Sequence, residues 1–301
     1  MWGIPIALYL FLAGVSAGAF AVASLVELRA AGDDGAGVGA AAGLLVRRIG
    51  AVVAVVALVV GTLFLVADAR GGLSNPVAFF GLLTNWTSPM TWGVAIIVLT
   101  LVFEALATVR AFAGKRGHGV LVAVGLVFAA LLAVYTGVLL SASQPVPLWN
   151  SGALVVLFVA SAFLSGSALV LLVARLAAGE AAGGVDQLIA SYGKAFVAVG
   201  ALEALALFAH LFAVAQVAPA GGATVASLLS GVYALPFWLG IVAVGIAVPL
   251  FAEVYAIKRQ GSQAAAGGAV QLVGFAAIVI GAAVLRILVV VAAQATVVSV
   301  L

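Results

Sequence analysis

The few charged residues of this chain lie in groups that are separated by long apolar stretches. Asp, Glu, Lys and Arg make up 7% of the 301 residues, whereas an ordinary soluble domain has about 25%. One bilayer-spanning helix needs roughly 20 apolar residues, so each stretch between consecutive basic groups is long enough to cross a membrane twice. The chain is therefore predicted to be an integral membrane protein. Ten of its 12 Lys and Arg residues form the basic groups, which are Arg29/Arg47/Arg48, Arg110/Lys115/Arg116, Arg175/Lys194 and Lys258/Arg259.

The apolar stretches predict an all-α membrane protein with eight transmembrane helices. Residues 119–174 contain no Asp, Glu, Lys, Arg or His, and Pro145 and Pro147 divide this run into two spans. Glycines, prolines and charged residues separate the other segments. No soluble domain is expected, so residues 1–301 are treated as a single membrane domain. The predicted helices cover about residues 5–28, 49–67, 92–112, 119–141, 151–174, 195–217, 231–256 and 270–297.

The basic groups also predict how the protein is oriented. They fall in the loops after the first, third, fifth and seventh helices, whereas the other loops carry only Arg70. Because loops rich in Lys and Arg stay in the cytoplasm, both termini are predicted to lie outside. The amino-terminal segment has no basic region before it, so it is expected to be a retained helix and not a cleaved signal.

The residue types that the protein lacks exclude several kinds of cofactor and partner. It has no cysteine, so it cannot hold an iron–sulfur cluster through thiolates. It has two histidines, of which His118 is predicted to lie in a loop, so His210 alone cannot provide the paired axial ligands of a b-type haem. No basic stripe alternates with aromatic residues, so nucleic acid is not an expected partner.

Small residues in the first and fifth predicted helices suggest close contacts between helices. The first contains Gly14, Ser16 and Gly18, and the fifth contains the run Ser161-Ala-Phe-Leu-Ser165-Gly166-Ser167. Small residues at this spacing let helices approach closely in lipid, which is favoured here over ligand contact. The similarity of these two helices also suggests two related four-helix bundles.

Several ionisable residues lie within the predicted spans. A charge in the middle of a bilayer costs about 2.5–3.5 kcal/mol or more, so such a residue usually faces the interior of the bundle and has a partner. These residues could form a proton path, centred on the sixth to eighth helices, or static ion pairs that fix the helix register. Both interpretations remain open for Glu104, Glu203, His210, Glu253 and Arg286.

Two tyrosines and an aspartate are predicted to lie near the outer face. Tyr9 begins the first helix, Asp68 ends the second, and Tyr135 lies six residues before Ser141 in the fourth. Phenols can donate hydrogen bonds to quinone carbonyls, and a carboxylate can take or give the protons that accompany electron transfer. A quinone site is therefore predicted here, with interfacial anchoring as the alternative role of the tyrosines.

The connection after the second helix, residues 68–91, is the long loop predicted on the outer side. It carries aromatic and polar side chains, and residues of this kind form belts at membrane interfaces. A docking surface or a lid over a site is an equally open interpretation. The residues concerned are Phe79, Phe80, Asn85 and Trp86, with Trp92 just beyond.

Three stretches of the sequence resemble the NrfD-like family, the membrane subunits of polysulfide reductase and related complexes. The first is Tyr9-Leu-Phe-Leu-Ala-Gly-Val-Ser-Ala-Gly18, and the second is Thr87-Ser-Pro-Met-Thr-Trp-Gly93. The third and most specific is Tyr135-Thr-Gly-Val-Leu-Leu-Ser141, followed by Pro147-Leu-Trp149-Asn150 and Leu157-Phe-Val-Ala-Ser161. One departure is the turn Asp68-Ala-Arg70-Gly-Gly, where the family often has an Asp-Leu-Gly-Arg-Pro-like sequence.

The resemblance implies a haem-free anchor in a prokaryotic cytoplasmic membrane that reacts with menaquinone or ubiquinone. It implies an outer-face quinone site in the first four helices. It also implies a docked four-cluster ferredoxin-like subunit and, through this subunit, a molybdopterin catalytic subunit. A secondary transporter is the alternative from another class, because buried charges and two similar halves also occur there. A structural anchor without a quinone site is the second alternative.

Overall fold

The computed structural model describes residues 3–30, 38–68, 88–114, 119–142, 146–217, 219–259 and 264–298. Within these ranges every regular element is a helix, and eight helical segments are long and apolar enough to cross a membrane. This confirms the predicted all-α membrane fold with eight spans. Most of the outer loop, including Phe79, Phe80, Asn85 and Trp86, lies outside the described residues, as do Lys115, Arg116 and His118.

The first four spans are single helices, and the other four are accompanied by short helical turns. The first set comprises α1 (Ile4–Ala30), α2 (Val38–Asp68), α4 (Pro89–Phe112) and α5 (Gly119–Ser141). The second comprises η1 (Pro147–Trp149), α6 (Gly152–Ala177), η2 (Gly179–Ala181), α7 (Ala182–Gln216), α8 (Pro219–Leu229), η3 (Pro236–Ala247), α9 (Val248–Lys258) and α10 (Ala264–Val298). The seventh span is therefore continuous but changes from the π-helical η3 to the α-helical α9 just before Pro249.

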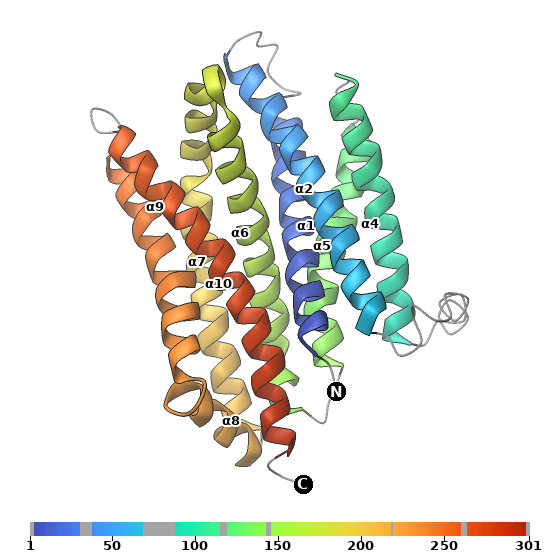
Figure 1. The fold of residues 1–301 in the computed structure, drawn as a ribbon, viewed down its shortest axis with the longest axis vertical. Coiled ribbons are helices and arrows are strands. Elements are labelled where there is room, and N and C mark those ends of the chain that lie inside the picture. The colour runs from blue at the N-terminus through green and yellow to red at the C-terminus, as the bar shows by residue number, and fades with distance from the viewer. Residues whose placement is uncertain are drawn as a thin grey trace.

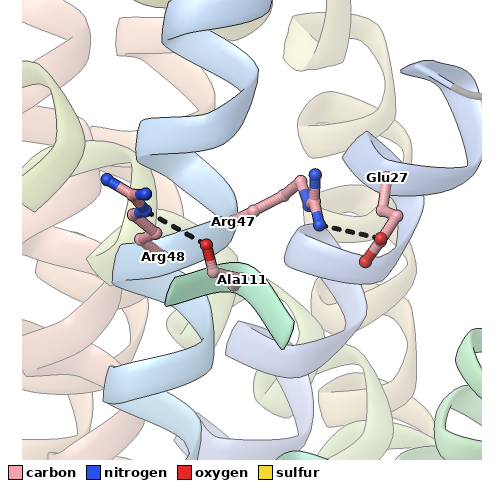
Figure 2. A network of polar contacts seen from close by, with 4 residues as sticks. All are labelled: Glu27, Arg47, Arg48 and Ala111. Atoms are coloured by element: carbon pink, nitrogen blue, oxygen red, sulfur yellow. Dashed lines mark hydrogen bonds and ion pairs between the residues drawn. The ribbon is translucent and has the colours of Figure 1, made fainter. Parts of the chain in front are cut away.

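The helices α2 and α7 begin far earlier than the sequence predicts, and the short helix α8 was not predicted. The second span starts at Val38 instead of near residue 49, and the sixth starts at Ala182 instead of near residue 195. Arg47, Arg48 and Lys194 therefore lie in helices and not in loops. Figure 2 shows that Arg47 pairs with Glu27 (2.8 Å) and that Arg48 Nε donates to the carbonyl oxygen of Ala111 (3.2 Å). The short helix α8 begins at a proline, whose missing N–H costs nothing in the first turn.

The two ends of the helix bundle differ in charge. The start of α1 and the end of α10 lie at one end, which we call the terminal end (Figure 1). The last turns of α1, α4, α6 and α9 lie at the opposite end, which we call the basic end. Each of these turns carries a basic residue, namely Arg29, Arg110, Arg175 and Lys258 respectively. Eight spans place the start of the first span and the end of the last on the same side, as the charge pattern requires.

The helices α1 and α6 form the centre of the bundle. In the apolar window of each span, 78% of the α1 residues and 72% of the α6 residues are buried, compared with 22% in α4. The two helices touch backbone to backbone, because a Cβ added at Gly18 would overlap the Ala162 carbonyl oxygen. A Cβ added at Gly166 would likewise overlap Val15 O and Ala19 N. This confirms that the small residues serve close helix packing.

Replacing Gly166 with alanine is expected to destabilise the protein by about 1–3 kcal/mol, the usual cost of overpacking a tight contact. The added methyl group must push the α1 and α6 backbones apart. Gly268→Ala is the matched control, because nothing lies within 4 Å of the position its Cβ would take. Thermal unfolding in detergent should give a lower Tm for Gly166→Ala than for Gly268→Ala. Equal Tm values for the two variants would contradict the close contact.

Candidate functional site

Tyr9 and Tyr135 lie near each other in the terminal half of the first four spans. Tyr9 in α1 is completely buried, and its hydroxyl has no hydrogen-bond partner among the described residues. Tyr135 in α5 is 7% exposed, and the two side chains are close enough to interact electrostatically. The Tyr135 ring and hydroxyl lie directly against Gly93 of α4, where a Cβ would overlap them. The structure thus brings the two predicted phenols together.

Asp68, the third residue of the predicted quinone site, lies closer to the membrane surface. It is the last residue of α2 and is partly exposed. Its Oδ1 would lie 3.5 Å from a Cβ added at Gly3, so its carboxylate lies beside the first turn of α1. Tyr9 follows Gly3 by six residues, which correspond to about 9 Å along a helix. Asp68 therefore lies nearer to the terminal end than the two phenols, and not between them.

Arg286 is the centre of a second polar cluster, which joins α10 to α1, α6 and α7. Its side chain is fully buried. Nε donates to Leu10 O (3.1 Å), Nη2 donates to Phe158 O (3.2 Å), and Nη1 donates to Ser161 Oγ (3.0 Å) and Ala282 O (3.3 Å). A buried guanidinium needs such partners, because an unpaired charge in a low-dielectric interior is costly.

Glu203 of α7 provides the negative charge of this cluster. It is 6% exposed, its carboxylate lies beside Ser161, and it interacts electrostatically with Arg286. Ser161 thus stands between the two charged groups. The structure brings Glu203 and Arg286 together across α7, α6 and α10, as the prediction of an interior-facing partner for each requires.

Glu253 of α9 forms a separate pair with Gln271 of α10. Gln271 Nε2 donates to Glu253 Oε2 (2.8 Å), whereas Oε1 is buried and has no hydrogen-bond partner among the described residues. Gly193 leaves room for this carboxylate on the α7 side, because a Cβ there would lie 3.3 Å from Oε2. Glu253 and Glu203 are both among the residues that line one small cavity, which lies mainly between α7 and the seventh span.

Glu104 and His210 lie apart from these groups. Ser16 of α1 donates to Glu104 Oε1 (2.6 Å), and the other oxygen of this fully buried carboxylate has no partner among the described residues. His210 is 1% exposed, and neither of its ring nitrogens has a hydrogen-bond partner among the described residues. Leu148, Leu207 and other apolar side chains surround it in a small cavity. The predicted proton-path residues therefore occupy at least three separate places.

Sequence reasoning missed the polar partners of these buried groups. Gln271 was not singled out, although it is a polar residue in an otherwise apolar helix, which was a usable signal. Ser16 and Ser161 were interpreted only as small packing residues. Their hydroxyls contact Glu104 and Arg286, and only the three-dimensional structure reveals these contacts.

The described side chains offer hydrogen bonding and proton exchange. They supply phenols, carboxylates, an imidazole and a guanidinium, most of them buried. Among the described residues, no group of three or more His, Asp or Glu side chains is arranged to hold a metal ion. The expectation that the protein binds neither haem nor an iron–sulfur cluster remains a prediction.

Comparison with known families decides the classification. The family described as "Polysulphide reductase, NrfD" matches residues 1–298, almost the whole sequence. The chain belongs to the NrfD family. This confirms the resemblance seen in the sequence. Members of this family are membrane subunits of respiratory oxidoreductase complexes.

Individual NrfD-family relatives match over most of their length. The C subunit of polysulfide reductase from Wolinella succinogenes is 30% identical over an alignment 278 residues long, which covers 84% of this protein and 83% of the relative. Protein NrfD of Escherichia coli is 30% identical over an alignment 332 residues long, which covers 99% of this protein and 96% of the relative. The Haemophilus influenzae NrfD homolog is 29% identical over an alignment 287 residues long, which covers 86% of this protein and 85% of the relative. The NrfD assignment therefore applies to the whole membrane domain and not to a fragment of it.

Proposed function

We propose that this NrfD-family protein is a haem-free membrane anchor that exchanges two electrons and two protons with a quinone, either menaquinone or ubiquinone. The electrons pass to or from a peripheral four-cluster ferredoxin-like subunit, which links the anchor to a molybdopterin catalytic subunit. The anchor itself does not carry the catalytic centre of the complex. It lies in a prokaryotic cytoplasmic membrane.

The observation that carries the proposal is the buried Tyr9 hydroxyl beside Tyr135. A buried polar group without a hydrogen-bond partner costs about 1–3 kcal/mol, so natural proteins rarely keep one without a use. A quinone carbonyl entering between α1 and α5 would accept a hydrogen bond from this hydroxyl. Its apolar ring and tail suit the surrounding helices, and Tyr135 supplies a second phenol nearby.

The position of Asp68 suits a role in proton exchange. Oxidation of a quinol releases two protons, and a partly exposed carboxylate at the end of α2 can accept them and pass them to water. The positive-inside rule predicts that the terminal end, and with it Asp68, lies on the outer side. The ferredoxin-like subunit would then dock at the same end, so its cluster lies close to the quinone.

The buried ionisable residues outside the quinone site are proposed to carry protons. They are Glu104, Glu203, His210, Glu253 and Arg286. The alternative of a secondary transporter is less well supported, because such transporters commonly have broken helices near the midplane. Here the seventh span changes its helix type near its middle but continues without a break. A structural anchor without a quinone site remains the second alternative.

Replacing Tyr9 or Tyr135 with phenylalanine tests the proposed site. Loss of one hydrogen bond to the substrate, worth about 1.4 kcal/mol, should slow quinol oxidation by the assembled complex about tenfold. Tyr9→Phe should not lower the Tm, because its hydroxyl bonds to no described residue of the protein. A slower reaction at unchanged stability separates a ligand-binding role from a structural one.

Tyr255→Phe is the matched control for both variants. Tyr255 lies in α9, stacks on Phe251 and takes part in a cation–π contact with Arg259. Its variant should oxidise quinol at the wild-type rate. Unchanged turnover in both Tyr9→Phe and Tyr135→Phe would refute the quinone site. A complex that contains the iron–sulfur partner but no bound quinone would support the structural anchor instead.

A further inference from the structure

A cavity opens at the basic end of the bundle between α6, α7, α9 and α10. Its volume is about 400 Å³, well above the roughly 150 Å³ of a cavity that can hold benzene. Arg175 and Asp186 form an ion pair on its wall. Most of the remaining lining is apolar, and small residues leave the space open, namely Ala190, Gly193, Ala256, Gly267, Gly268 and Ala269. A mixed lining of this kind suits an amphiphilic molecule that carries charge at one end.

The cavity can be reached from the side of the bundle, along the line where α7 and α9 meet, which we call the seam. The two helices lie side by side (Figure 1). Gly193 and Ile257 close the seam on its deeper side, because a Cβ added at Gly193 would lie 3.5 Å from Ile257 Cγ1. Ala190 lies one turn nearer the basic end, lines the cavity and is exposed, so the seam is open there. The apolar run of α7 begins only after Lys194, which places this opening at the level of the lipid headgroups.

Two lysines flank this opening. Lys194 follows Ala190 by one helical turn, so the two residues lie on nearly the same face of α7. Lys258 directly follows Ile257, and Val254, one turn before Lys258, is also exposed, so Lys258 lies on the lipid-facing side of α9. Both lysines are exposed, and neither forms an ion pair with another described residue. Two positive charges thus stand on either side of the opening without a counter-charge from the described part of the protein.

Arg175 adds a third cation inside the cavity. Its Nε donates to Asp186, whereas neither Nη1 nor Nη2 donates to a described residue. Arginine has five N–H donors, so the guanidinium can hold an anionic oxygen atom while it stays paired with Asp186. Across the basic end of α6, η2, α7 and α9, four cations outnumber two acids, so the opening has a net positive charge. They are Arg175, Lys194, Lys258 and Arg259, against Glu180 and Asp186.

We propose that an anionic phospholipid binds at this opening, with its phosphate between Lys194 and Lys258 and its polar headgroup in the cavity beside Arg175. Basic pockets between transmembrane helices bind anionic headgroups in other membrane proteins. A phosphate accepts charge-assisted hydrogen bonds from ammonium and guanidinium groups, and these are about twice as strong as neutral ones. A choline lipid fits less well, because its own trimethylammonium group offsets the charge of its phosphate. The inference goes beyond the quinone reaction and uses none of the residues of the quinone site.

Native mass spectrometry of the full-length chain in a non-ionic detergent tests the lipid preference. Phosphatidylglycerol should bind more tightly than phosphatidylcholine with the same acyl chains. Lys194→Gln and Lys258→Gln should each weaken phosphatidylglycerol binding about fivefold, which corresponds to about 1 kcal/mol per lysine. The double variant should lose about 25-fold if the two contributions add.

Arg259→Gln is the matched control for the loss of a positive charge. Arg259 directly follows Lys258, but its Cβ lies toward α10, beside Gly267, and its guanidinium lies over the Tyr255 ring. This variant should bind phosphatidylglycerol as the wild type does. An affinity as low as that of Lys258→Gln would show that general surface charge holds the lipid, and would overturn the site.

A tryptophan at the opening tests the position of the site without changing its charge. Ala190→Trp should fill the opening and weaken phosphatidylglycerol binding, whereas Ala198→Trp, further along the lipid-facing side of α7, should not. Size-exclusion profiles identify a variant that fails to fold, and the lysine variants change only exposed side chains. Unchanged binding in a folded Ala190→Trp variant would contradict a lipid in the opening.

Two further outcomes would overturn the lipid site. One is equal affinity for phosphatidylglycerol and phosphatidylcholine. The other is displacement of bound phosphatidylglycerol by glycerol phosphate at the same concentration, which would identify a site for a free anion. None of these measurements uses quinol, so the lipid site and the quinone site can fail separately.

Discussion

Replacing Arg286 with methionine is expected to destabilise the protein by about 3–5 kcal/mol, the cost typical of leaving a buried charge uncompensated. The guanidinium bonds to Leu10 O on α1 and to Phe158 O and Ser161 on α6, so it joins both central helices to α10. Its loss leaves the Glu203 carboxylate buried without a compensating charge. Reversible unfolding in mixed detergent micelles would measure the change in free energy.

A second substitution separates charge from packing in this cluster. If the uncompensated Glu203 carboxylate causes much of the lost stability, adding Glu203→Gln to Arg286→Met should restore part of the free energy of unfolding. Additive losses in the double variant would show that the two residues act independently. Arg286→Lys should be intermediate, because a single ammonium cannot reproduce the planar fork that reaches α1 and α6 together.

Arg175→Met is the control for removing an arginine that forms an ion pair. Arg175 pairs with Asp186 at the basic end, where the two side chains are 35% and 51% exposed. Exposed ion pairs contribute about 0–1 kcal/mol, so this variant should unfold nearly as the wild type does. If Arg286→Met were as mild as Arg175→Met, the buried cluster would not hold the helices together.

The sequence predicted the number of spans well, because hydropathy over about 20 residues directly reflects the thickness of the bilayer. It predicted the starts of α2 and α7 poorly for the same reason. The first turns of α7 contain Asp186 and Lys194, which suggested a loop although they form a polar extension of the helix. A hydropathy window detects the apolar part of a helix and not its polar end.

The interior-facing charges were also predictable, but their partners were not. Glu203, Glu253 and Arg286 stand out because each interrupts a long apolar run. The partners of Arg286 are mainly backbone carbonyl oxygens from α1 and α6, which carry no signal in a sequence. The cavity that Arg175, Asp186 and Gln271 line depends on how α6, α7, α9 and α10 pack, and the order of residues along one helix does not contain that geometry.

Cysteines at Gly152 and Gly183 are expected to react from opposite sides of the membrane. Gly152 is the first residue of α6, at the terminal end, and Gly183 is the second residue of α7, at the basic end. Both are accessible, and nothing lies within 4 Å of an added Cβ at either position, so the substitutions should not disturb the fold. The absence of natural cysteine removes any background labelling.

The positive-inside rule predicts which cysteine reacts first. The last turns of α1, α4, α6 and α9 each carry Lys or Arg at the basic end, so this end should be cytoplasmic. A membrane-impermeant maleimide added to intact cells should label Gly152→Cys and not Gly183→Cys. Permeabilised cells should show labelling of both. Leu205→Cys should stay unlabelled throughout, because Leu205 of α7 is 63% exposed on the outer surface of the bundle, where lipid would cover it.

The opposite labelling pattern would change the functional proposal and not only the topology. Tyr9, Tyr135 and Asp68 lie toward the terminal end, so an inverted protein would place the quinone site near the cytoplasm. The iron–sulfur partner would then have to dock on the cytoplasmic face, because electrons must pass directly between the quinone and its cluster.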